Sequence, residues 1–110
     1  MQIQIRMVQQ ITVVEIIGEI TGATARVVQT EVLALATPEV RMLLDMRRVP
    51  FMSSAGLRVL LMIYRKVSDK GGKVHLAALP DDLRNTMSVT GFLNFFIHHE
   101  DIDAGLAALA

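Results

Sequence analysis

The chain has 110 residues, the length of one domain whose hydrophobic core needs no disulfide or metal ion to hold it. Hydrophobic residues make up 52% of the sequence and charged residues 20%, which excludes an intrinsically disordered chain. The 11 basic and 11 acidic residues cancel and cysteine is absent, which argues against nucleic acid as a direct partner and excludes cysteine-based zinc sites. We therefore expect residues 1–110 to form a single domain.

The N-terminal part of the chain has the pattern of two paired strands. Apolar and polar residues alternate over residues 3–7, which predicts a strand with one solvent-facing side. Residues 11–17 are mostly β-branched, which predicts a second and more buried strand. Gln9 and Gln10 are expected to form a turn between them, and Gly18 ends the second strand, so the two strands should form a hairpin.

A helical pattern follows the hairpin. Apolar residues recur at the spacing of an amphipathic helix between Thr24 and Ala36. Thr21 is the expected N-cap of this helix, and Pro38 prevents its continuation. The short apolar run at residues 40–46 predicts a buried strand.

The longest amphipathic helix is predicted over residues 55–68, after a loop at residues 49–54. Its apolar residues form one stripe, which comprises Leu57, Leu60, Leu61, Tyr64 and Val67. Residues 74–79 predict a further strand after a double glycine that ends the helix.

The C-terminal third predicts two helices and one strand. Pro80, followed by two aspartates, opens a short helix that Gly91 closes. Residues 95–98 suit an edge strand, and a final helix follows with Asp101 or Asp103 near its cap. The resulting order, β-β-α-β-α-β-α-β-α, predicts an α/β domain with a mostly parallel sheet, because alternating strands and helices need crossover connections.

No stretch of the sequence is long enough to cross a membrane. The longest apolar run, residues 59–64, ends at Arg65 and Lys66, whereas a span needs about 20 apolar residues. The first residues, MQIQIR, lack the basic start and the apolar stretch of a signal peptide. We therefore expect no membrane insertion and a cytoplasmic location.

The loop that opens the longest helix, residues 51–57 (the serine loop), is the one local feature with functional chemistry. Ligand and effector sites of α/β folds lie where a strand turns into a helix. Ser53 and Ser54 would lie at the positive end of the helix dipole, where an added phosphate is tolerated, and Gly56 would let a partner approach the backbone closely. The simpler interpretation is that Ser53 is an N-cap and Gly56 a packing glycine.

Five segments together resemble the STAS family, specifically its small anti-sigma factor antagonists. They are GEIT at residues 18–21, LLDM at 43–46, SSAGLR at 53–58, GGKV at 71–74 and TGFL at 90–93. The resemblance covers nearly the whole chain, and its most specific part is SSAGLR. It implies the STAS fold, with a mixed sheet of about four or five strands and about four helices.

The resemblance implies a regulatory binding protein that is not an enzyme and holds no cofactor. Unphosphorylated members bind an anti-sigma factor, which is a serine kinase of the histidine-kinase-like ATPase fold, and thereby free the sigma factor. The kinase phosphorylates a serine before the second helix and the complex dissociates, until a PP2C-type phosphatase removes the phosphate. By position, Ser54 corresponds to this serine. Ser53 stands where many members carry aspartate, and it is the alternative acceptor.

The residues around the serine loop are expected to contact the partner. Methionine and arginine suit protein interfaces, and the segment before the first helix is expected to reach the same edge. The expected partner-binding residues are Thr21, Thr24, Arg26, Met52, Ser53, Ala55, Gly56, Leu57 and Arg58. For Met52, ordinary packing in the core is an open alternative.

Other polar groups have simpler interpretations. The HHED sequence at residues 98–101 has the residue types of a metal site, but neighbouring side chains of an extended segment point to opposite faces, so we expect no metal. Asp45 is expected to orient the serine loop by a hydrogen bond, and Arg47 and Arg48 to form a solvated basic spot. His75 is expected to be a surface residue or a hydrogen-bonded core residue rather than a catalytic base.

A second function class stays open from the sequence. A STAS subunit of a lipid-trafficking ABC transporter, or another membrane-associated STAS regulator, would dock permanently on its partner without being phosphorylated. The retained serines favour the regulator over this alternative.

Overall fold

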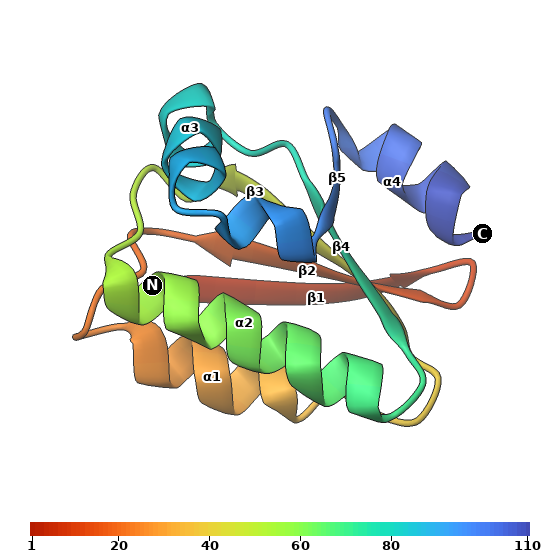
Figure 1. Ribbon diagram of the computed structural model, residues 1–110. Coiled ribbons are helices and arrows are strands. Elements are labelled where there is room, and N and C mark those ends of the chain that lie inside the picture. Colours follow the sequence, from red (N-terminus) through yellow and green to blue (C-terminus); the bar gives the residue numbers. More distant parts are fainter.

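The computed structural model describes all 110 residues and contains one five-stranded sheet (Figure 1). In spatial order, which is also the chain order, the strands are β1 (Gln2–Val8), β2 (Ile11–Ile17), β3 (Arg41–Arg48), β4 (Lys73–Ala77) and β5 (Ile97–His99). The first two strands are antiparallel, and every later strand is parallel to the one before it. The predicted α/β class with a mixed, mostly parallel sheet is confirmed.

Four α-helices connect or follow the strands. They are α1 (Ala25–Leu33), α2 (Ser54–Asp69), α3 (Asp81–Val89) and α4 (Ile102–Leu109), and a short 3-10 helix spans Phe92–Phe95. Apart from that 3-10 helix, the elements follow the predicted order. No helix has both the length and the apolar character that a membrane crossing requires.

Two hydrophobic cores of unequal size lie on opposite faces of the sheet. The larger contains 23 buried residues, and α1, α2 and α3 all contribute to it. The smaller comprises Ile11, Val13, Leu43, Ala77 and Leu109, with Leu109 coming from α4. Successive residues of a strand point to opposite faces, so Leu43 joins the small core and Leu44 the large one. Figure 1 shows α1 and α2 packed side by side along the sheet.

The β1–β2 hairpin closes on a two-residue turn, as predicted. Gln9 and Gln10 have φ values of 51° and 68°, and positive values at both positions are the mark of a type I′ turn. The register pairs Val8 with Ile11 and runs without a shift to the pair of Gln2 with Ile17.

The N-terminus of α1 differs from the prediction. Thr24, and not Thr21, occupies the N-cap position. Thr21 instead begins a turn in which its carbonyl accepts hydrogen bonds from the N–H groups of Thr24 and Ala25, at 3.1 and 2.8 Å. The prediction failed because either threonine suits a cap and only this turn decides between them.

Several strand boundaries also differ from the prediction by one or two residues, and β3, expected to end at residue 46, continues to Arg48. β4 ends at Ala77, because Ala78 has a φ of 59° that leaves the extended conformation. The last strand begins at Ile97, because Phe92–Phe95 forms the 3-10 helix that the sequence pattern did not predict.

The apolar face of α2 is rotated slightly from the predicted stripe. Its buried residues are Gly56, Leu57, Val59, Leu60, Ile63 and Val67. Leu61 and Tyr64, expected in the stripe, are only half-buried at its margin. The Tyr64 ring packs edge-on against the rings of Phe95 and Phe96, with centroids 5.9 and 5.5 Å apart.

Candidate functional site at the start of helix α2

The serine loop enters α2 while held against the segment that precedes α1. The N–H of Ile20 donates to the carbonyl of Phe51 at 3.0 Å, and the N–H of Ser53 donates to the carbonyl of Ile20 at 2.9 Å. These two bonds make an isolated parallel bridge between Ile20 and Met52. The structure thus brings the turn before α1 beside the serine loop.

The threonines of that turn use their hydroxyl groups within the chain. Thr24 Oγ1 donates to the carbonyl of Glu19 at 2.7 Å and accepts from the N–H of Thr21 at 2.9 Å. Thr21 Oγ1 accepts from the N–H of Ala23 at 3.3 Å. Both threonines are half-buried, whereas Arg26 on the first turn of α1 is exposed. The threonines therefore shape this edge, and Arg26 follows them as an exposed residue at the start of α1.

The two serines of the loop have opposite environments. Ser53 is the N-cap residue of α2 in an extended conformation, yet its hydroxyl makes no capping bond. That hydroxyl oxygen is buried without a hydrogen-bond partner. Ser54 is the first residue of the helix and is exposed. Ser53 therefore occupies the predicted N-cap position, but its hydroxyl forms no capping hydrogen bond.

Gly56 is a packing glycine. A Cβ atom at this position would lie 2.8 Å from the carbonyl oxygen of Ile20 and 3.0 Å from its Cγ2. Contacts below 3.0 Å force something to move, and here the nearest atom belongs to the backbone. The expectation that Gly56 leaves its backbone open to a partner is wrong, because Ile20 already occupies that space.

Two further residues expected to contact the partner lie in the core. Met52 and Leu57 are buried and belong to the larger hydrophobic core. Met52 faces inward because of its bridge to Ile20, and Leu57 because it lies on the buried side of α2. Their side chains pack in the core beneath the exposed residues of the serine loop. Ala55 is half-buried beside them.

The exposed part of the site surrounds Ser54. Arg58 is exposed one helical turn later, and its Nε atom donates to the carbonyl of Ser54 at 3.4 Å. Phe51 is 51% exposed immediately before buried Met52. Phe51 was not among the residues expected to contact the partner, although alternation in an extended segment puts it on the face opposite to Met52.

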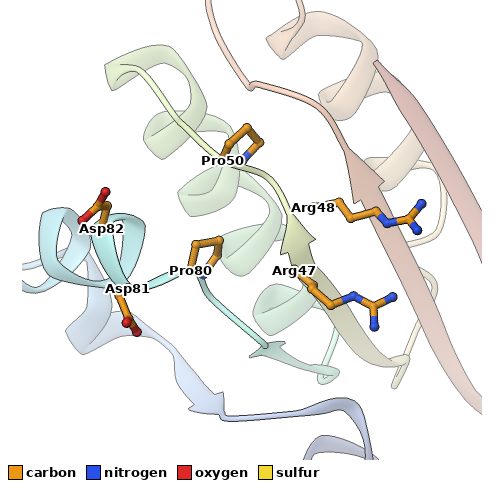
Figure 2. A pocket seen from close by; sticks show the side chains of 6 residues that line it. All are labelled: Arg47, Arg48, Pro50, Pro80, Asp81 and Asp82. Carbon is orange, nitrogen blue, oxygen red and sulfur yellow. The ribbon is translucent and has the colours of Figure 1, made fainter.

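An open hollow of about 650 Å³ adjoins the serine loop where β3 and β4 end (Figure 2). Its lining residues are Arg47, Arg48, Pro50, Pro80, Asp81 and Asp82. Figure 2 shows both arginines pointing away from the two aspartates at the start of α3. Arg47 Nη2 lies 3.5 Å from Glu15 Oε2, and Asp81 Oδ1 lies 2.9 Å from Arg84 Nη2. Arg47 and Asp81 are therefore paired with residues outside the hollow, and the arginines do not point toward the aspartates across it.

Asp45 does not hydrogen-bond the serine loop, contrary to expectation. It is buried in β3, and its Oδ1 atom accepts from the N–H of Arg47 at 3.1 Å. Its carboxylate therefore fixes the end of its own strand, from which the loop departs.

A histidine pair lies elsewhere, between β4 and β5. His75 is buried, and its Nδ1 atom is 3.0 Å from Nε2 of His99. Burial lowers the pKa of His75 below 6.5, and the nearby charges of His99 and Lys73 lower it further. His75 is thus a hydrogen-bonded core residue, one of the two roles expected for it.

The sequence model of the STAS domain family matches residues 2–105. The chain belongs to the STAS domain family. Among curated proteins, this STAS domain is 32% identical over 92 residues to BtrV of Bordetella bronchiseptica, a candidate anti-sigma factor antagonist. The match covers 83% of this chain and 79% of BtrV. The family resemblance carried by the five sequence segments is confirmed.

Solved structures share the fold of this STAS domain. An anti-sigma factor antagonist from Mycobacterium paratuberculosis superposes with a TM-score of 0.87 at 24% identity, over 98% of this chain and 92% of that one. The Bacillus cell fate determinant SpoIIAA in its phosphorylated form superposes with a TM-score of 0.72 at 15% identity, over 99% and 100% of the chains. The STAS fold expected from the sequence is confirmed.

Proposed function

We propose that this STAS domain is an anti-sigma factor antagonist that works by partner switching. In its unphosphorylated form it binds an anti-sigma factor and frees the sigma factor, and phosphorylation of Ser54 ends that binding. Identity to BtrV supports the first part, and the phosphorylated form of the fold neighbour SpoIIAA supports the second. It acts by binding and not as an enzyme.

The observation that carries the choice of Ser54 is the contrast between the two serines. A kinase must bring the acceptor oxygen in line with the phosphate of its nucleotide, so the hydroxyl has to be accessible. Ser54 is exposed, whereas the hydroxyl of Ser53 is buried. Ser53 would have to leave its place at the start of α2 to react.

The start of α2 can hold a phosphate without loss of the fold. A phosphoserine adds about −1.5 to −2 charges, which the positive end of a helix dipole stabilises. The first turn of α2 contains no acidic residue to repel it, and Arg58 lies one turn away on the same face. The same charge at the centre of a docked interface would be desolvated without a partner, so it weakens binding and not folding.

The proposed contact surface consists of the exposed groups around Ser54. They are Phe51, Ser54, Arg26 and Arg58, with Thr21, Thr24 and Ala55 at the margin. Aromatic residues and arginine are among the residue types that interaction interfaces favour. The buried Met52, Gly56 and Leu57 support this surface from below.

The proposed partners follow from the family. The anti-sigma factor is a serine kinase of the histidine-kinase-like ATPase fold, and a PP2C-type phosphatase restores the binding form, both in the cytoplasm. The nucleotide and its magnesium ion belong to the kinase. The equal numbers of basic and acidic residues suit protein partners better than nucleic acid.

Intact-mass analysis after incubation with the cognate kinase and Mg-ATP tests the proposal. The wild type and Ser53→Ala should each gain one phosphate, and Ser54→Ala should gain none. An equal gain in Ser54→Ala would move the acceptor away from Ser54. Co-purification with transporter ATPase subunits, without any phosphate, would instead assign the role of a permanent docking subunit.

A further inference from the structure

The free edge of the sheet at β1 has only one of the features that usually prevent edge strands from pairing, the charge of Arg6. β1 has seven residues and pairs with β2 only, while the opposite edge strand, β5, has three. Proteins protect long edges with proline, charged side chains (above all lysine), bulges or a covering segment. β1 has no proline or lysine, and its register with β2 has no shift. No turn, loop or cap hydrogen bond reaches a backbone group of β1.

The hairpin turn determines which backbone groups face outward. In a two-residue hairpin the closing residues, here Val8 and Ile11, exchange hydrogen bonds, and such pairs alternate along an antiparallel ladder. The N–H and C=O groups of Ile3, Ile5 and Met7 therefore point away from β2, to the free edge. The side chains of all three residues are apolar, with Ile5 47% and Met7 63% exposed.

We propose that a second copy of this chain pairs with β1, antiparallel and around a two-fold axis at Ile5. In this register Ile5 faces Ile5 of the second copy, and Ile3 faces Met7 of the second copy. All outward backbone groups of these residues are then paired, which gives about six new hydrogen bonds, two for each facing pair. The two five-stranded sheets join into one.

Charge supports the same register. Arg6 is the only charged residue of β1. With the axis at Ile5, Arg6 of each copy faces Gln4 of the other, whose amide oxygen can accept its hydrogen bonds. An axis at Arg6 would place two like charges directly opposite each other, which destabilises a strand pair. A strand-to-strand contact of this size is smaller than a standard interface, so we expect a dimer that dissociates on dilution.

Sedimentation velocity from low micromolar to near-millimolar concentration tests the dimer. The wild type should associate reversibly, and Ile5→Lys should raise the dissociation constant by at least about tenfold, because two ammonium groups meet at the axis. Val89→Lys is the matched control, since Val89 is 88% exposed on α3 and the substitution adds the same charge. A wild type that stays monomeric throughout, or equal association of both variants, would overturn the proposal.

Cross-linking tests the register without relying on the folding of Ile5→Lys. The chain contains no cysteine, so a single introduced thiol can react only with its copy. Ile5→Cys should oxidise to a disulfide-linked dimer, since Cα atoms of such a facing pair lie about 5.5 Å apart. Met7→Cys should link poorly, because four residues of strand, about 14 Å, separate the two Met7 positions. Equal linkage of Ile5→Cys, Met7→Cys and Val89→Cys would contradict the proposed pairing.

Discussion

The carbonyl oxygen of Ile20 accepts the hydrogen bond of the Ser53 N–H at 2.9 Å and is also the atom on which Gly56 packs. The peptide group of Ile20 therefore sets both where α2 begins and how closely the first turn of α2 packs against the segment before α1. The serine loop owes its position to this contact, which joins parts of the chain that are far apart in sequence.

Gly56→Ala should therefore destabilise the domain. The added methyl would lie 2.8 Å from the Ile20 carbonyl oxygen, and overpacking of this kind costs about 1–3 kcal/mol. Gly22→Ala is the control, because a Cβ at Gly22 meets no atom within 4 Å. Urea unfolding compares the two, and an unchanged midpoint for Gly56→Ala would show that the contact is readily relieved.

Ser54→Asp should separate binding from folding. We expect its affinity for the anti-sigma factor to fall by at least about a hundredfold, because the carboxylate is desolvated in the interface. Its thermal unfolding should match the wild type, since the charge lies at the positive end of α2. Calorimetric titration and a circular dichroism melt measure the two effects.

Ser88→Asp, at an exposed serine of α3, is the matched control for Ser54→Asp. It should bind like the wild type. Loss of the folded state in Ser54→Asp would contradict the proposed tolerance of the helix start for negative charge.

Phe51→Ala should weaken partner binding by at least about tenfold while leaving stability nearly unchanged. The ring is half-exposed, lies in the same loop as Ser54 and belongs to neither core. The same titration measures the affinity, with Val89→Ala as a distant apolar control on α3. Equal affinities of Phe51→Ala and the control would remove this ring from the contact surface.

The His75–His99 pair should make the domain less stable in mild acid. Because burial lowers the pKa of His75 in the folded state, the unfolded chain takes up the proton first as the pH falls below 6.5. The free energy of unfolding should therefore drop from pH 6.5 down to the folded-state pKa, and show no contribution from His75 above pH 6.5.

Urea unfolding across this pH range measures that dependence. His75→Gln should flatten it, while His98→Gln, at an exposed position of β5, should preserve it. Identical slopes in His75→Gln and the wild type would assign the acid sensitivity to other groups.

Local sequence patterns predicted most of the elements, because periodicity and turn residues act over a few positions. The hairpin turn at Gln9 and Gln10 and the stop before Gly91 are of this kind. Asp101 was one of two candidate caps, and the structure selects it through the bond from the N–H of Ala104 at 2.8 Å.

The failures of the sequence analysis have a common cause in contacts between distant segments. For Met52 and Gly56 the sequence left contact with a partner and inward packing both open, and the structure decides for packing through the Ile20 segment, which lies more than thirty positions earlier in the printed sequence. The His75–His99 contact likewise depends on the pairing of β4 with β5. No local pattern encodes which distant residue fills such a space.

Because the two cores differ in size, the segments that cover them should differ in the free energy of local unfolding. Only α4 covers the face of the sheet that carries the smaller core. It is held there by the buried Leu109 side chain and by the hydrogen bond from Arg41 Nη1 to the Leu109 carbonyl at 3.0 Å. Fluctuations that lift this terminal segment disturb few buried groups, so its amide protons should exchange with deuterated solvent well before those of the central strands.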